Sequence, residues 1–310
     1  VSARDDAEDA RDEAEFFAST LDLVNDLSQA YEFATVAEMT ASNIVFPVGK
    51  KLNTIVNNTT SNAGGASYVV SNTAIADGYG NHTLSGGNVA ELIIDNILNP
   101  VQWGAIGNKT ANDTLAVEAM LNAIVDGIVI DFKGFICSVE SNLYVDSINN
   151  ITVNGGGGGL FKSGGTSLFT DPVLSFNSCE DLTIMNILVQ GSYSGSSLDA
   201  GDYGIRLGSC KRVLLSDSIF KDWGDSAWTV RTKLGGTVGK TESSDVTVNG
   251  NVFDNVYQTS TTGNSGGVIN YTFTSNICNT IGAIKFASRS DNAENLIVTN
   301  NVIISQGTAL

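Results

Sequence analysis

A short stretch near residue 222 places two carboxylates beside an indole ring. It reads Asp222-Trp223-Gly224-Asp225 and follows a run that alternates apolar and polar residues. Hydrolysis of a glycosidic bond uses two carboxyl groups, one protonated as the acid and one ionised as base or nucleophile. An indole adds a flat apolar face against which a sugar ring can stack. The stretch therefore indicates glycoside hydrolysis with Asp222 and Asp225 as the carboxylate pair.

Further residues of the same kinds occur nearby in the sequence. Asp254 and Asp202 are two more candidate catalytic carboxylates on outward loops. Trp228 and Tyr203 can extend the substrate-binding surface that Trp223 begins. All of these residues have a structural alternative, in which an Asp binds the N–H groups of its own turn and a Trp packs in the core.

A lyase is the competing chemistry, because a lyase needs a base and cations that neutralise an acidic sugar. Arg206 in the run 204–207 and Lys285 in the run 283–286 hold the same outward place in alternating sequences. A basic stripe of this kind suits the binding of an anionic polysaccharide. The alternative is scattered charge that serves only to keep the chain in solution.

A repeated phrase in the second half of the chain must position these residues. Each copy is an alternating run, then one or two small polar residues, then another apolar pair. The copies begin at Ile151, Leu182, Val213, Val246, Tyr271 and Leu296. Consecutive starts lie 31, 31, 33, 25 and 25 residues apart. Alternation indicates strands with one buried face, and a fixed recurrence indicates stacked copies. We therefore predict a mainly β fold built on a parallel β-solenoid, with an antiparallel sandwich as the alternative.

Composition argues against several other classes of function. The formal net charge is −17, so we expect no nucleic acid partner, since phosphates are bound by clustered Lys and Arg. The chain has 1 His and 4 dispersed Cys, which argues against a zinc site and against Ser-His-Asp catalysis. Cys179 and Cys210 lie one copy apart, and we expect them to stack as buried reduced thiols. No apolar run approaches a membrane span, so we expect no membrane partner. From the scarcity of His and the dispersed Cys we also expect no metal, and we expect no cofactor.

The N-terminal segment has the spacing of a coiled coil. In residues 3–24, Ala, Phe, Leu and Val recur at alternating steps of four and three between mostly charged residues. We expect residues 1–30 to form an acidic helix that bundles with other chains. The alternative is a solvated amphipathic helix packed on its own domain.

Two segments lie between this helix and the repeats. Residues 31–100 read as a small β-rich module of short strands, the first at 36–39, separated by Gly and Asn turns. Residues 101–126 read as a strand, a Gly turn and a helix capped by Asn112 or Asp113. A helix at this point is well placed to cover the first coil of a solenoid, which otherwise exposes an apolar end.

The second of these segments resembles a known entry signature. Trp-Gly-Ala-Ile-Gly at 103–107 and Asn-Asp-Thr at 112–114 are similar to the start of the pectate-lyase-like right-handed β-helix family. The chain departs from that signature at Lys109 and Asn112, which lie in the turn and in the cap.

The segment before it resembles the head module of bacteriophage tailspikes, through residues 33–39, 45–50 and 64–68. The resemblance implies a homotrimer in the virion tail, joined through its N-terminal region to phage tail or adaptor proteins. It also implies binding, and usually cleavage, of a host surface polysaccharide, either capsule or lipopolysaccharide. Hydrolysis is favoured over elimination.

The expected organisation has four segments. They are an N-terminal coiled-coil helix at 1–30, a head module at 31–100, an entry strand and capping helix at 101–126, and a right-handed parallel β-helix at 127–310. The last copy has no closing cap, so we expect further coils, and with them part or all of the catalytic groove, beyond residue 310. Two alternative functions stay open: a non-enzymatic receptor-binding or branching tail fibre on the same scaffold, and a free polysaccharide lyase.

Overall fold

The computed structural model describes residues 11, 15, 29–163, 172–194, 203–231, 243–262, 268–280 and 293–305. The chain divides into two compact units, residues 1–93 and 94–310, and each is described by itself. The helix expected over residues 1–30 lies outside the described residues except at positions 11, 15, 29 and 30. Within the described part, no helix is long and apolar enough to span a membrane.

The first unit is built on a five-stranded sheet. Its strand order is β1-β2-β5-β7-β6, and the β1–β2 pair is parallel whereas the other pairs are antiparallel. The strands are β1 (Tyr31–Phe33), β2 (Lys51–Thr54), β5 (Ser67–Ser71), β6 (His82–Thr83) and β7 (Val89–Leu92), with a separate pair β3 (Val56–Asn58) and β4 (Ala63–Gly64).

The expected strand at 36–39 is wrong, because these residues belong to helix α2 (Val36–Ala41). The hydroxyl of Thr35 accepts a hydrogen bond from the Glu38 N–H, which caps the first turn of α2. Val36 and Met39 are the buried residues of this helix, so their spacing of three follows a helical face and not a strand.

The second unit begins with short elements that lead into the solenoid. They are β8 (Ile97–Leu98), the 3₁₀ helix η1 (Pro100–Trp103), β9 (Asn108–Asn112) and α3 (Thr114–Asn122). The side chain of Asn112 accepts from the N–H of Thr114, as a cap should. Asp113 instead accepts from the N–H groups of Ile106 and Gly107, and so fastens the preceding turn to the start of α3.

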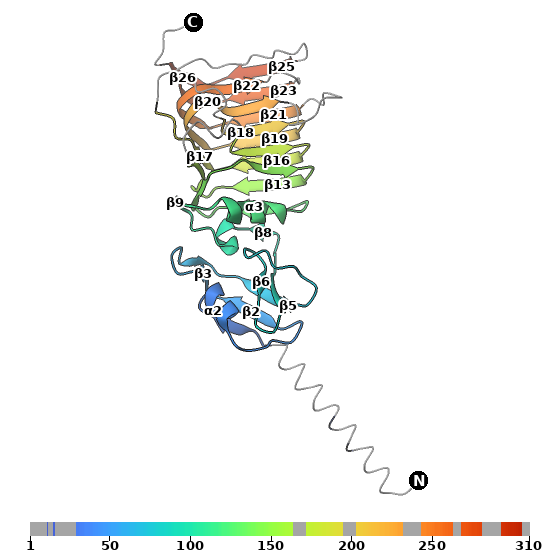
Figure 1. The fold of residues 1–310 in the computed structure, drawn as a ribbon. Helices are drawn as coiled ribbons and strands as arrows, with labels where there is room; N and C mark the ends of the chain where they lie inside the picture. Colours follow the sequence, from blue (N-terminus) through green and yellow to red (C-terminus); the bar gives the residue numbers. More distant parts are fainter. Residues whose placement is uncertain are drawn as a thin grey trace, which may run out of the picture. The chain divides into compact units, whose positions relative to one another are not determined.

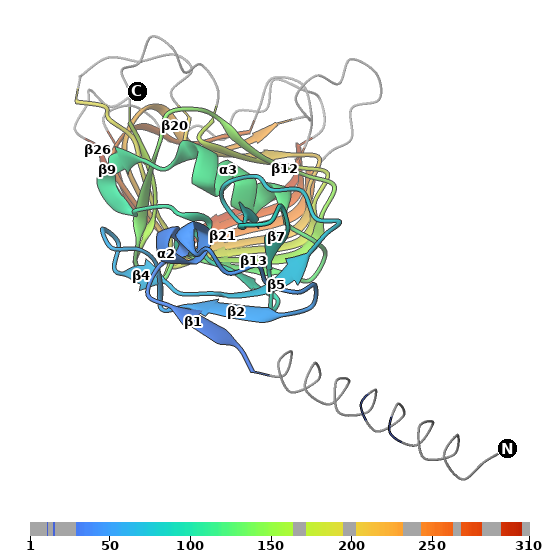
Figure 2. The ribbon, with the colours of Figure 1, turned by 60° about the horizontal axis from the view of Figure 1, so that its bottom comes forward.

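The helix α3 packs against β11 and β12 at one end of the stacked coils, and Figure 2 shows it lying across their mouth. This is the position that the sequence predicts. Its buried residues include Val117, Met120 and Leu121. Residues three and four apart on a helix share a face, so this set forms one stripe toward the coils.

The coils stack into two parallel sheets (Figure 1). The first is eight-stranded, in the order β25-β23-β21-β19-β16-β13-β10-β8. Its further strands are β10 (Val129–Asp131), β13 (Asn149–Asn154), β16 (Glu180–Met185), β19 (Lys211–Ser216), β21 (Ser243–Asn249), β23 (Val268–Thr274) and β25 (Ala293–Thr299). The register pairs the six predicted starts with one another in sequence order, from Ile151 to Leu296. The repeat is therefore confirmed residue by residue.

The second sheet is eleven-stranded, with the order β12-β15-β18-β20-β17-β14-β11-β9 along its main path and β22, β24 and β26 joined beyond β20. Its remaining strands are β11 (Ile136–Val139), β12 (Leu143–Asp146), β14 (Gly159–Lys162), β15 (Leu174–Asn177), β17 (Leu188–Gln190), β18 (Ile205–Gly208), β20 (Ile219–Arg231), β22 (Val252–Thr262), β24 (Ile277–Thr280) and β26 (Val302–Ser305). The long strand β20 pairs with β17 near its start and with β18 near its end, so it joins two faces of the coil.

Every strand pair described in the solenoid is parallel, which contradicts the antiparallel sandwich. The corner between the two sheets explains the small polar residues of the repeat. The corner residues with positive φ are Asn186, Asp217, Gly250, Ser275 and Asn300. Asn, Asp and Gly adopt the left-handed conformation most readily, so these residue types turn the chain from one sheet to the other.

Side chains inside the coil continue the stacking. Phe220 and Phe253 stack with their ring centroids 5.2 Å apart. Cys179 and Cys210 are free and buried, as expected from their spacing. The thiol of Cys210 donates to the carbonyl of Phe176 over 3.3 Å. A continuous apolar interior of this kind holds the outward residues of successive coils at a fixed spacing of roughly 4.8 Å.

Candidate functional site

Asp222 is the centre of a hydrogen-bond network on the outer face of the second sheet. Its Oδ2 accepts from Nε2 of Gln190 at 2.8 Å, and its Oδ1 accepts from Nδ2 of Asn255 at 2.7 Å. Its carbonyl accepts from the Tyr193 N–H at 3.0 Å. These partners lie on neighbouring coils, so the carboxylate of Asp222 ties three coils together.

The network continues toward the first coils through a lysine. Nζ of Lys109 donates to Oε1 of Gln190 at 2.8 Å and lies 4.8 Å from the centre of the Phe161 ring. A cation over an aromatic face is attracted by the ring quadrupole. We call Lys109, Gln190, Asp222 and Asn255 the Asp222 network. It offers ammonium, amide and carboxylate groups from four strands of the second sheet, β9, β17, β20 and β22.

A row of polar residues runs along the same sheet. Its members pair in register on successive strands, and we call them the polar row. They are Gln190, Lys221, Asp254 and Asn279. Nζ of Lys221 lies 3.5 Å from Oδ2 of Asp254, and Nδ2 of Asn279 donates to Oδ1 of Asp254 at 2.9 Å. The face therefore presents a hydrogen-bonding group on each of four successive coils.

Asp222 and Asp225, the predicted pair, lie in different surroundings. Asp222 is half-buried on the outer face, whereas Asp225 is 8% exposed and accepts from the hydroxyl of Ser226 at 3.0 Å. Asp254 is half-buried on the outer face within the polar row. Three of the four candidate catalytic carboxylates are described by the structure. Of these three, Asp222 and Asp254 are more accessible from the outer face than Asp225.

The interpretation of Trp223 and Trp228 as sugar-stacking residues is wrong, because both rings are fully buried. Nε1 of Trp223 donates to the carbonyl of Val189 at 3.0 Å. The cause is the left-handed backbone of Asp222, with φ of 59°, which interrupts the alternation of β20. Phe220 and Trp223 both face the core, although a regular strand would turn residues three apart to opposite faces.

Among the described residues, the structure shows no exposed basic stripe at the predicted position. Arg206 pairs in register with Ser175 and Thr229 and is only 9% exposed. Tyr203 is half-buried, and its carbonyl accepts from the Val173 N–H. Asp202 and Lys285 lie outside the described residues.

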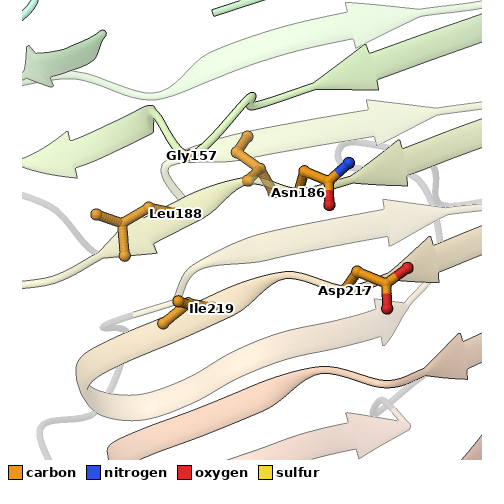
Figure 3. Close-up of a pocket in the computed structure, with 6 residues that line it drawn as sticks. Gly157, Asn186, Leu188, Asp217 and Ile219 are labelled. Carbon is orange, nitrogen blue, oxygen red and sulfur yellow. The ribbon is translucent and has the colours of Figure 1, made fainter. Parts of the chain in front are cut away.

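A small hollow lies beside the corner between the two sheets (Figure 3). It encloses about 160 Å³ and is lined by Gly157, Asn186, Ile187, Leu188, Asp217 and Ile219. Pockets for small molecules usually measure roughly 300–1,000 Å³. This hollow is below that range, so the open face with the polar row is the better candidate for a binding surface. No group of three or more His, Cys, Asp and Glu side chains in the described part of the chain is arranged to hold a metal ion.

Lys109, Gln190 and Asn255 were not among the residues predicted for the site. A signal for the polar row is nevertheless present in the sequence. Gln190, Lys221, Asp254 and Asn279 each lie eight residues after the start of a copy of the repeat. Lys109 carries no such signal, because it precedes the copies and reaches Gln190 only through the stacking of the coils.

A comparison with protein-family models and with curated proteins finds no match. Among solved structures, the chain is similar to the tailspike protein gp49 of Acinetobacter baumannii bacteriophage Fri1, a capsular polysaccharide depolymerase. The TM-score is 0.54 at 14% sequence identity, covering 90% of this chain and 60% of that one. It is also similar to the gp42 tailspike of Acinetobacter phage vb_AbaP_AS12, with a TM-score of 0.51 at 14% identity, covering 89% of this chain and 58% of that one.

This similarity confirms the expected resemblance at the level of the fold: the chain has the β-solenoid architecture that occurs in phage tailspikes. The chain spans 60% and 58% of the lengths of these two proteins. At 14% identity the likeness concerns the fold, and the activity has to be argued from the chain's own residues.

Proposed function

We propose that the chain is part of a phage tailspike that binds a bacterial surface polysaccharide, either capsule or lipopolysaccharide, along the outer face of its second sheet. The observation that carries the proposal is the polar row, in which Gln190, Lys221, Asp254 and Asn279 repeat once per coil. A polymer of sugar units has hydroxyl groups at regular intervals along its length. A surface that offers donors and acceptors roughly every 4.8 Å can bind several units at once.

The charge and chemistry of these groups suit a sugar chain. Amides such as Gln190 and Asn279 both donate and accept hydrogen bonds, as sugar hydroxyls do. Lys221 and Asp254 add charge-assisted hydrogen bonds, which are roughly twice as strong as neutral ones. The fold shared with a capsular polysaccharide depolymerase supports the same choice of ligand.

The proposed reaction is hydrolysis of the bound polysaccharide, with Asp222 and Asp254 as the accessible carboxylates and Asp225 and Asp202 as further candidates. One must be protonated as the acid and the other ionised. The proposed assembly is a homotrimer of right-handed β-helices, bundled through residues 1–30 and joined there to phage tail or adaptor proteins. Right-handed crossovers between parallel strands are the general rule.

A second candidate function is non-enzymatic binding on the same scaffold. It is favoured by the contacts of Asp222, because Gln190 and Asn255 each donate to one of its carboxylate oxygens. A carboxylate held in this way serves the packing of the coils well and has less freedom to act on a substrate. The two functions share the binding surface and differ in turnover.

The experiment measures release of reducing ends from purified capsules and lipopolysaccharides by the wild-type chain and its variants. For hydrolysis we expect Asp222→Asn and Asp254→Asn each to lower the rate roughly 100-fold or more. The control is Asp245→Asn, which makes the same change at an exposed position of β21 in the first sheet. Binding without turnover in the wild-type chain would select the non-enzymatic function, and equal rates in all variants would remove these two residues from the reaction.

A further inference from the structure

Phe161 extends the polar row by one strand beyond Gln190. It pairs in register with Gln190 on one side and with Ser138 on the other. Phe161 is half-buried on the outer face of the second sheet, whereas Ser138 is only 1% exposed. The accessible part of the row therefore ends at Phe161, and the side chain of Lys109 reaches this end from β9.

The ammonium group of Lys109 is held at a defined place over the Phe161 ring. Its Nζ lies 4.8 Å from the ring centre and donates to Oε1 of Gln190 at 2.8 Å. The amide nitrogen of Gln190 donates in turn to the carboxylate of Asp222. An amide turned the other way would set its NH₂ against the ammonium, so these two partners fix its orientation. The cation is therefore in position before any ligand arrives.

The charge of Lys109 is not neutralised by an ion pair within the described part of the chain. Its contacts there are a neutral amide and an aromatic ring. By contrast, Lys221 in the polar row lies 3.5 Å from a carboxylate oxygen of Asp254. An ammonium group has three N–H donors, and Gln190 occupies one of those of Lys109. Two N–H groups and an uncompensated positive charge are therefore available to a ligand.

We propose that Lys109 and Phe161 form a subsite for an acidic sugar unit, one that carries a carboxylate, at the end of the polar row. This inference rests on the proposed function and adds to it the class of polymer, an acidic polysaccharide. The carboxylate of the sugar accepts from the ammonium of Lys109 and supplies the counter-ion that the described part of the chain does not provide. Hydrogen bonds between two charged groups are roughly twice as strong as neutral ones, so the subsite favours a carboxylate over a hydroxyl group.

The Phe161 ring strengthens this preference. It covers one side of the ammonium and keeps water away from that side, so the attraction to a carboxylate is screened less than at a fully exposed lysine. The ring also limits the side-chain freedom of Lys109, which reduces the entropy lost when a ligand binds.

The acidic residues of the same face do not oppose a bound carboxylate at this end. Asp254 lies three strands from Phe161, roughly 14 Å along the sheet, which exceeds the screening length of about 8 Å in physiological salt. Asp222 is nearer, but each of its carboxylate oxygens accepts from an amide, of Gln190 or of Asn255. The order of the groups therefore puts the cation at one end of the row and the carboxylates further along it.

The test compares polymers that differ only in charge. The probes are purified capsular polysaccharides that contain a uronic acid, each beside the same polymer after chemical reduction of its carboxyl groups to alcohols. Equilibrium binding is measured on the 310-residue chain. We expect the wild-type chain to bind the acidic form roughly tenfold more tightly than the reduced form, as the loss of one charge-assisted hydrogen bond implies. This comparison needs no variant, so it holds even where a substitution disturbs folding.

The variants then assign the preference to Lys109. Lys109→Gln should remove the preference for the acidic form and leave the affinity for the reduced form unchanged, whereas Lys109→Arg should retain the preference. The matched control is Lys133→Gln. Lys133 has the same left-handed backbone, with φ of 49° against 68° for Lys109, but it is exposed after β10 and outside the row. Its replacement should leave the preference as in the wild type.

The failures of this inference and of the proposed function are distinguishable. Equal binding of the acidic and reduced forms by the wild-type chain would overturn the subsite and leave the polysaccharide-binding face standing. A preference that Lys109→Gln retains, or that Lys133→Gln loses to the same extent, would do the same. An absence of binding to both forms of every polymer would overturn the subsite and the proposed function together.

Discussion

Asn276 occupies the inner side of the corner between the sheets, and its side chain bonds to the coil before it and to the coil after it. The residue is fully buried. Its Oδ1 accepts from the backbone N–H of Asn251 at 2.9 Å, and its Nδ2 donates to the carbonyl of Val248 at 3.0 Å. Nδ2 also donates to Oδ1 of Asn301 at 3.1 Å. Replacing Asn276 by Ala therefore leaves two backbone groups of the preceding coil, the N–H of Asn251 and the carbonyl of Val248, without these partners.

The expected loss of stability follows from these contacts. A buried polar group that loses its partner costs about 1–3 kcal/mol. We expect the full cost for the N–H of Asn251. For the carbonyl of Val248 we expect only part of it, because a carbonyl oxygen has a second lone pair. We expect Asn276→Ala to lower the free energy of unfolding by about 2–4 kcal/mol. For a unit of this size, that corresponds to a fall of roughly 4–16 °C in the unfolding midpoint.

The assay is thermal unfolding followed by circular dichroism, with Asn249→Ala as the control. Asn249 is half-buried on the outer side of the same corner, so its truncation should change stability by less than about 0.5 kcal/mol. An Asn276→Ala midpoint within about 2 °C of the wild type would refute the reasoning. It would mean that water or a shift of the strands replaces the lost hydrogen bonds.

Three further predictions test other parts of the fold. Gly204→Ala should prevent folding of the second unit, because its Cβ would lie 2.2 Å from the carbonyl oxygen of Ala227, and soluble yield with circular dichroism reports this. Burial lowers the pKa of His82 below its ordinary 6.5. The contribution of this residue to the stability of the first unit is therefore full above pH 6.5 and falls as the pH drops toward the lower pKa of the folded state. An NMR titration of the only histidine in the sequence measures that pKa. The Arg212 guanidinium lowers the pKa of the exposed Asp181 carboxyl, so the pair stabilises the fold above pH 3.8 and this is lost as the pH falls. Arg212→Gln should return that pKa toward 3.8 in an NMR titration.

The repeat made the solenoid predictable, because alternation and spacing are properties of the sequence itself. The starts at Ile151 and Leu182, for example, were expected to be equivalent, and they pair directly in the first sheet. The strands β15 and β18 gave a weaker signal. Both alternate apolar and other residues over only four positions and lie outside the repeated phrase, so the sequence does not identify them as part of a second sheet.

The candidate site was predictable only in part, because its geometry depends on features that alternation does not reveal. The left-handed backbone of Asp222 turns Trp223 into the core, and a sequence pattern cannot show such a residue. The contact between Lys109 and Gln190 joins residues 81 positions apart. It forms only once the intervening coils have stacked. The polar row is the exception, since its members hold one fixed place in the repeat.

The most direct test of the proposed polysaccharide-binding face is an equilibrium binding measurement on purified capsules and lipopolysaccharides, with Lys221→Gln compared with Lys211→Gln. Both lysines form ion pairs on the solenoid, at 3.5 Å to Asp254 and at 2.8 Å to Glu180, but Lys211 belongs to the first sheet. Loss of a charge-assisted hydrogen bond corresponds to an affinity roughly tenfold weaker. The account predicts that loss for Lys221→Gln and wild-type affinity for Lys211→Gln. Equal affinity for both variants, or an absence of binding to every polysaccharide in the panel, would contradict it.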